Sequence, residues 1–575
     1  MQMTKAASQA KPSNGYGAIA VDKIKINDTA HTRVQDVSCS RAHRIPMWAG
    51  LAMGLFALFA FLNKDSAPAA IPSNGSTEKN GVDDDNLWDV PSFIQQKVDH
   101  FSKRNKNKFY QRYYESDKYW AGPGHPIFMV MGGEGPAWGL FYPFVNDHLA
   151  KKWEGYVIQP EHRFYGFSQP LSEIKHNDDF VGLLTPEQAM QDALHLLQEI
   201  QKKLGCSTNK SSKQYCPVIT VGGSYPGFLA AMLRIVHPDK VDMAYASSSP
   251  LPLYAQDIDP NAFYDIVADS ADHTSPGCSE AVRSSLRTIN DEIISGEHHF
   301  THYAEKLDVC VRTLPEYIDT NAVFAQELMM TIAAAFADFS MGNYPPSNHT
   351  DMALACHIFQ DTTLTPYDKV DELFEIMIAA QVDDCGFDVE PAKNCGFDFL
   401  TQIPGGPNGT VSSGDWTGGG NGVAGLAWDF QTCSDLVVQA GFSEKSMFPV
   451  REWTYEWLTQ HCKSRFGRDP APSRLVDKFY FQKENLPSIT SHIIFTNGLQ
   501  DGWSAGSILE SLSDTLIAIN IPSGAHHSDL SGAGPSERDP PDMWATFGQV
   551  KDILGTWLDE LKASHQENAI DNRAK

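Results

Sequence analysis

The chain has 575 residues, 42% of them hydrophobic, and carries a formal net charge of −26 at pH 7. This length can bury a large core and allows more than one domain. The acidic balance excludes a general nucleic-acid-binding protein, because such proteins meet phosphates with basic surfaces.

An apolar segment near the N-terminus predicts a membrane anchor. Residues 45–62 contain no charged side chain, and their length is at the short end of what spans a bilayer. Residues 1–44 contain seven Lys and Arg against three Asp, so the positive-inside rule places them in the cytosol. We therefore expect a disordered cytosolic tail over 1–44, a type II signal anchor over 45–62 and a linker over 63–84.

A cleaved signal peptide is the alternative for the same segment, because residues 67–70 supply small side chains for a cleavage site. A leader of more than 40 residues is long for that role, which favours the anchor. Either way, the rest of the chain is expected in the lumen of the secretory, lysosomal or vacuolar pathway or outside the cell. Without the tail's four excess positive charges, the net charge of this part is about −30. At acidic pH its carboxylates protonate and repel one another less, which is compatible with an acidic compartment.

The segment around Ser224 has the pattern of a nucleophile elbow. The β-branched run at 218–221 is followed by two glycines, Ser224 and a helical pattern. A serine hydroxyl is a poor nucleophile, so acyl-transfer enzymes hold it on such a sharp strand-to-helix turn beside a base. Pro226 stands one residue before the glycine that usually completes the pattern, at a first-turn position that accepts proline. An ordinary strand-to-helix turn is the alternative.

A second glycine-rich turn lies upstream of the elbow. The apolar run at 127–131 predicts a strand that leads into Gly133 and Glu134. If Ser224 is the nucleophile, the backbone N–H groups of Tyr225 and Gly133 are the expected oxyanion donors. Glu134 could anchor a substrate amine or pair with Arg163.

An acid and a histidine follow downstream in the order that α/β-hydrolases use. Asp501 comes just after a buried strand over 491–498, and His526 and His527 come just after a second strand over 515–521. Ligands bind at the carboxyl ends of strands in open α/β sheets. We therefore predict Asp501 as the orienting acid and His526 as the base, with His527 as the alternative base.

The distance from the elbow to the acid is too long for one uninterrupted sheet, so an insertion is expected over 255–470. It contains helical runs at 322–339 and 369–380, and a Gly-rich stretch at 405–425 that indicates an exposed loop rather than a ligand site. The expected organisation is a core over 85–254 and 471–565, interrupted by this helical cap, with a C-terminal tail at 566–575.

The cysteines indicate an oxidising compartment. Cys39 lies in the predicted tail, and nine cysteines lie beyond the anchor with no Cys-x-x-Cys repeat, so disulfides are favoured over zinc. Cys206 and Cys216 are expected to close a local loop, and at least one of the nine stays unpaired. No metal or cofactor is expected. The sequons beyond the anchor predict glycosylation at Asn74, Asn209, Asn348 and Asn408.

From about Phe93 to Trp557 the chain resembles the lysosomal Pro-X carboxypeptidase family of serine peptidases. The resemblance implies an α/β-hydrolase core with a largely helical cap inserted between nucleophile and acid. It also implies the triad Ser224, Asp501 and His526, and hydrolysis next to a penultimate proline at either end of a peptide. It rests on the strings at 93–101, 111–113, 131–136, 161–166, 184–189, 428–433 and those already described.

Trp503 and Phe228 are the expected apolar wall for a proline ring, with core packing as the alternative for Phe228. Family members usually carry glycine at the position of Pro226, methionine at that of Phe228 and proline at that of Gly502. The expected partners are peptide substrates, the membrane through its single helix and a second copy of the chain in a homodimer, with no nucleic acid. The alternatives in function are an esterase or lipase of the same fold and a catalytically silent binding protein.

Overall fold

The computed structural model describes residues 90–174, 176–307, 320–381, 422–532 and 534–574. All of them lie in one compact unit of the chain, Leu51–Lys575. The predicted tail, anchor and linker at 1–84 lie outside the described residues.

The core is an eight-stranded mixed sheet in the order β1-β2-β4-β3-β5-β6-β7-β8. The first two strands are antiparallel additions at one edge, and the other six are parallel to one another. Every residue of the central strands β3, β5, β6 and β7 is buried, as expected for a parallel sheet that is covered on both faces. The strands are β1 (Ser92–Lys97), β2 (Lys108–Ser116), β3 (Ile127–Val130), β4 (Tyr156–Pro160), β5 (Val218–Gly223), β6 (Met243–Ser247), β7 (Ile493–Gly498) and β8 (Leu516–Ile521).

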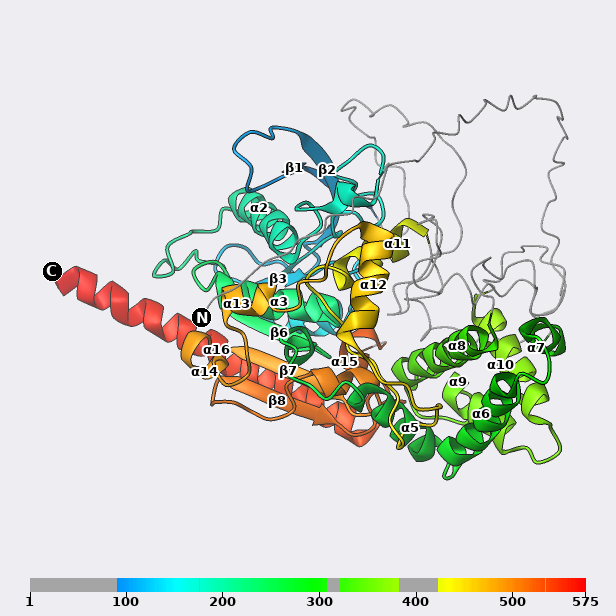
Figure 1. Ribbon diagram of the computed structural model, residues 1–575. Helices are drawn as coiled ribbons and strands as arrows, with labels where there is room; N and C mark the ends of the chain where they lie inside the picture. The colour runs from blue at the N-terminus through cyan, green and yellow to red at the C-terminus, as the bar shows by residue number, and fades with distance from the viewer. Residues whose placement is uncertain (1–89, 175, 308–319, 382–421, 533, 575) are drawn as a thin grey trace, which may run out of the picture. The chain divides into compact units, whose positions relative to one another are not determined.

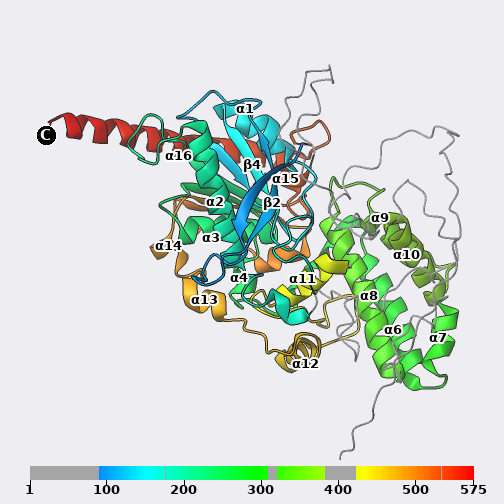
Figure 2. The same cartoon turned by 90° about the horizontal axis from the view of Figure 1, so that it is seen from above.

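Alternate residues of these strands enter two separate hydrophobic cores. On one face, Ile127 and Met129 of β3 pack with α2 (Pro186–Leu204) and α3 (Tyr225–Val236). On the other face, the intervening strand residues pack with η3 (Phe144–Leu149), α1 (Ala150–Trp153) and α16 (Pro541–Ala574), and Figure 1 shows α16 alongside β7 and β8. Figure 2 shows α2 and α3 together on one side of the strands. This arrangement is the predicted α/β core.

The chain between β6 and β7 is helical, as the sequence predicts. Within its described residues the only β pairing is an isolated bridge between Phe442 and Arg451. Residues 422–425 of the stretch predicted as an exposed loop begin α11, so that prediction is wrong there, and 405–421 lie outside the described residues. The helices are α4 (Leu251–Tyr254), α5 (Ala262–Thr274), α6 (Cys278–Ser295), α7 (Phe300–Lys306), α8 (Asn321–Met341), α9 (Asp351–Gln360), α10 (Pro366–Gln381), α11 (Gly422–Thr432), α12 (Tyr455–Phe466), α13 (Arg474–Phe479) and α14 (Leu486–Ile489).

Helix α8 is the one described helix that is long and apolar enough to cross a membrane by length and composition. Its most apolar window is 61% buried inside the structure, and it packs against α5, α6 and α9. We therefore interpret α8 as an interior helix of the insertion.

Three disulfides join described cysteines: Cys206–Cys216, Cys278–Cys356 and Cys433–Cys462. The first is the predicted loop closure before β5, and the second ties α6 to α9. Two of the four sequon asparagines, Asn209 and Asn348, are exposed. The remaining cysteines and sequons, Cys39, Cys310, Cys385, Cys395, Asn74 and Asn408, lie outside the described residues.

Candidate active site

Ser224 occupies a strained turn between β5 and α3. Its φ is 61° and its ψ is −136°, a backbone conformation that costs a non-glycine residue of order 1–3 kcal/mol. The two preceding glycines make the turn sterically feasible. A Cβ on Gly222 would lie 2.2 Å from the carbonyl oxygen of Pro226, and one on Gly223 would lie 2.6 Å from Cγ of His527.

Pro226 lies in the first turn of α3, where its missing N–H leaves no helical bond unmade. Its ring faces the loop after β3, because a Cβ on Gly133 would lie 2.7 Å from Cγ of Pro226. The loop that contains Gly133 therefore lies directly against the start of α3, which follows Ser224.

Asp501 and His526 form a buried pair at the carboxyl ends of β7 and β8. Nδ1 of His526 lies 2.6 Å from Oδ2 of Asp501, and the two side chains are 4% and 0% exposed. The other carboxylate oxygen accepts the backbone N–H of Trp503 at 3.0 Å. A carboxylate on Nδ1 fixes the imidazole tautomer and leaves Nε2 free to accept a proton.

His527 has different surroundings from its neighbour. Its backbone N–H donates to Oγ of Ser248 at 2.9 Å, and its buried Nδ1 has no hydrogen-bond partner among the described residues. Burial, followed by the charge of the adjacent His526, lowers the pKa of His527 well below its usual value. The acid is thus paired with His526 and not with the alternative base. The His527 ring contacts Gly223. The loop after β8 that carries His526 and His527 therefore lies against the turn that carries Ser224.

The suggested pairing of Glu134 with Arg163 is wrong. Arg163 binds Asp192 instead, with Nε 2.6 Å from Oδ2 and Nη2 2.8 Å from Oδ1. Burial raises the pKa of Glu134 above its usual value, and the charge of His526 opposes that rise. Glu134 therefore lies within electrostatic range of His526.

The two residues expected to line an apolar pocket differ in exposure. Phe228 is fully buried, with its ring centroid 5.0 Å from that of Tyr254 and 5.6 Å from that of Phe481, so it occupies a core position. Trp503 is only partly buried, and its ring packs edge-on against Phe263 at 4.6 Å between centroids.

A polar network that the sequence did not predict lies beside the elbow. Tyr165 donates to Gln431 at 2.5 Å, and Gln431 donates to the hydroxyl of Tyr225 at 3.1 Å. That hydroxyl lies 3.0 Å from Nε2 of His162, and burial lowers the pKa of His162 to about 4, which keeps the ring neutral. The network links the residue after Ser224 to α11. Its members fall within family strings, but a string does not reveal which residues touch.

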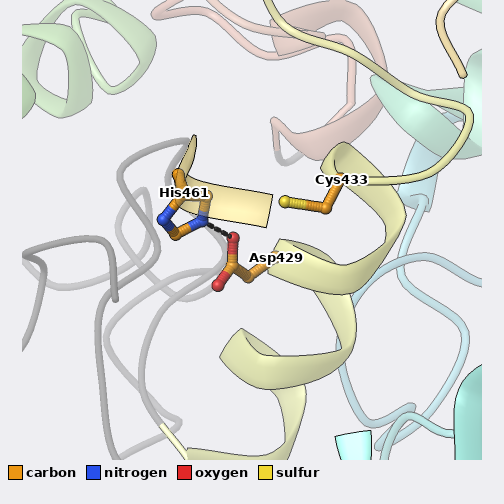
Figure 3. A group of neighbouring side chains, drawn as sticks. All are labelled: Asp429, Cys433 and His461. Carbon is orange, nitrogen blue, oxygen red and sulfur yellow. Dashed lines mark hydrogen bonds and ion pairs between the residues drawn. The ribbon is translucent and has the colours of Figure 1, made fainter. Parts of the chain in front are cut away.

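Asp429, Cys433 and His461 bring potential metal ligands within 4.8 Å of one another. Figure 3 shows the aspartate and cysteine extending from α11 and its C-terminal end toward the histidine. Cys433 is bonded to Cys462 and so offers no thiolate. The other two residues form a buried pair, with Nε2 of His461 2.7 Å from Oδ1 of Asp429. We assign no metal to this group.

The sequence model of the serine carboxypeptidase S28 family matches residues 96–546. The chain belongs to this family. It is therefore a serine-type peptidase with an α/β-hydrolase core.

The S28 chain is 28% identical over 479 residues to the lysosomal Pro-X carboxypeptidase of Bos taurus, covering 82% of this chain and 88% of that protein. It is 24% identical over 487 residues to the thymus-specific serine protease of Mus musculus, covering 82% and 88%. Among solved structures, proline iminopeptidase of Mycobacterium smegmatis is 11% identical with a TM-score of 0.34, covering 82% of this chain and 99% of that one.

Proposed function

We propose that this S28 peptidase is an exopeptidase that hydrolyses peptides next to a penultimate proline, with Ser224, Asp501 and His526 as its triad. The observation that carries the proposal is the buried 2.6 Å pair of Asp501 and His526, whose loop contacts the strained elbow at Ser224.

In the proposed reaction, Nε2 of His526 takes the proton from Oγ of Ser224 as the oxygen attacks the scissile carbonyl carbon. Asp501 stabilises the imidazolium that forms. The backbone N–H groups of Tyr225 and Gly133 are proposed to bind the negative oxygen of the tetrahedral intermediate. Collapse breaks the C–N bond, and His526 gives its proton to the leaving amine. Water then attacks the acyl-enzyme with His526 again as base, which restores Ser224.

For the direction of cleavage we propose release of a C-terminal residue after proline. The relatives named Pro-X carboxypeptidase support this choice. Trp503 is partly exposed next to the acid and is the proposed wall for the proline ring.

We also propose that the catalytic part lies in the lumen of the secretory pathway or outside the cell, held by the predicted anchor at 45–62. The disulfides between described cysteines support an oxidising compartment. The exposed sequons at Asn209 and Asn348 are the proposed glycan sites, and peptide-N-glycosidase digestion of protein from secretory cells should shift its mass by two or more glycans.

The proposed function is tested with the full chain in detergent and two reporters, an N-blocked peptide that ends in Pro-X and a free-amine X-Pro amide. We expect release of X from the first reporter alone. Ser224→Ala and His526→Ala should abolish this activity. His527→Ala should keep most of it, since His527 carries no acid partner in the described structure. Cleavage of only the X-Pro amide would reverse the direction, and hydrolysis of p-nitrophenyl esters without either peptide would favour an esterase.

A further inference from the structure

The last turn of α8 contacts the backbone on both sides of Asp501. Oγ of Ser340 donates to the carbonyl oxygen of Gln500 at 2.8 Å and accepts the N–H of Gly502 at 3.3 Å. Ser340 is 0% exposed. If its hydroxyl is removed, water cannot easily take over either bond, and two backbone groups beside the acid lose their partner.

The next residue of α8 contacts the histidine loop. The carbonyl oxygen of Met341 accepts the N–H of His526 at 3.2 Å. Its Sδ lies 3.1 Å from Nε1 of Trp503, in the loop that follows the acid. Two successive residues of the helical insertion thus hold both loops whose side chains form the acid–histidine pair.

The core provides few other links between these two loops. The acid loop, which carries Asp501, follows β7. The histidine loop, which carries His526, follows the adjacent strand β8. Beyond the strands, the N–H of Leu499 donates to the carbonyl of Ile521, the N–H of Gln500 to that of Gly524, and Nε2 of Gln500 to that of Pro522. All three bonds lie before Asp501. The bond from Ser340 to Gly502 and the bond from Met341 to His526 are the ones by which helix α8 holds these loops at the proposed catalytic side chains. Beyond His526 the core also holds the chain, through the bond from the N–H of His527 to Oγ of Ser248.

Helix α8 itself packs inside the insertion, against α5, α6 and α9. Phe336, one turn before its end, packs against the rings of Phe339, Phe359 and Phe448. Ser340 and Met341 thus connect this packed helix to the two loops.

We propose that Ser340 is a positioning residue for the triad, and that the end of α8 couples the seating of the helical insertion to the alignment of Asp501 with His526. This inference rests on the proposed function, because it assigns Ser340 a role in that reaction. No sequence motif marks this role, since Ser340 is 161 positions before the acid and lies within an apolar helix.

The test compares the full chain with Ser340→Ala and Ser340→Cys. Cysteine fills the volume of serine but forms only weak hydrogen bonds, so it guards against a folding defect in the alanine variant. Ser285→Ala is the matched control, because Ser285 is also buried in the insertion but bonds only to Ala281 of its own helix. Each protein is titrated with a fluorophosphonate probe, and kcat and KM are measured on the Pro-X reporter.

We expect the rate constant of probe labelling and kcat to fall about 10- to 100-fold in both Ser340 variants, the range that small misplacements of reacting groups produce. The labelled fraction at completion and KM should change less than about threefold, and Ser285→Ala should match the parent. A wild-type labelling rate in Ser340→Cys overturns the inference, as does a reduced labelled fraction at an unchanged rate, which marks a role in folding alone. If Ser224→Ala is still labelled and active, it is the proposed function that fails.

Discussion

Glu187 makes the stability of the protein depend on pH in a way that can be measured. Its carboxylate, in the first turn of α2, accepts bonds from Nη1 and Nη2 of Arg474 at 2.7 and 2.9 Å and from Nζ of Lys478 at 2.9 Å. The same guanidinium binds Asp435 at 2.6 Å. The cluster joins α2 of the core to α13, which follows the insertion.

The magnitude of this contribution follows from the pKa of Glu187. Burial alone would raise that pKa, but the bonds and charge of Arg474 outweigh burial and lower it from 4.5 to about 2. A shift of that size corresponds to about 3 kcal/mol of unfolding free energy. Because the side chain of Arg474 is 38% exposed, solvent screening reduces this to about 1–2 kcal/mol. The depressed pKa means that this stability is present above pH 4.5 and is lost as the pH falls toward 2.

The assay is thermal unfolding of the parent protein and Glu187→Gln at several pH values from 7 downward. Glutamine keeps the shape but not the charge, so we expect its melting temperature to be lower at pH 7 and the difference to shrink below pH 4.5. Glu199→Gln, at an exposed position of the same helix, is the control and should melt like the parent at every pH. A difference that stays constant from pH 7 to the lowest pH at which both proteins are folded would refute the ion-pair argument.

Three further substitutions test the site and its support. Asp501→Asn should lower kcat on the Pro-X reporter by about 10⁴-fold through loss of the correct imidazole tautomer, with an unchanged melting temperature as the check on folding. Gly223→Ala would place a Cβ 2.6 Å from His527, so probe labelling should slow by about 100-fold or more. Arg163→Met leaves the buried carboxylate of Asp192 without its bidentate partner, and we expect a loss of about 3–5 kcal/mol in unfolding free energy, seen as a lower melting temperature in both buffer and urea.

The sequence predicts what is local in this structure. The strand before Ser224 and the strand before Asp501 are short apolar runs that end in turn residues, a pattern that marks buried parallel strands without reference to the rest of the chain. Because open parallel sheets expose their carboxyl ends at one edge, the same pattern predicts that Asp501 and His526 come together. The structure brings them to 2.6 Å.

What the sequence does not predict are partners that are far apart along the chain. Arg163, which follows β4, pairs with Asp192 of α2 rather than with Glu134, and no periodicity encodes that choice. The position of Ser340 beside Asp501 has the same origin. Whether Phe228 lines a pocket or fills the core depends on Tyr254 and Phe481, and contacts of this kind are set by tertiary packing.

The three departures from the family pattern are each matched by a neighbour in the structure. The ring of Pro226 occupies the space beside Gly133, where any side chain on the glycine would clash. A Cβ at Gly502 would lie 2.9 Å from the ring of Phe263, so the proline usual in the family would require this phenylalanine to move. Phe228 fills a closed aromatic cluster. None of these accommodations touches the bond between the proposed acid and base, which lies on the loops after β7 and β8.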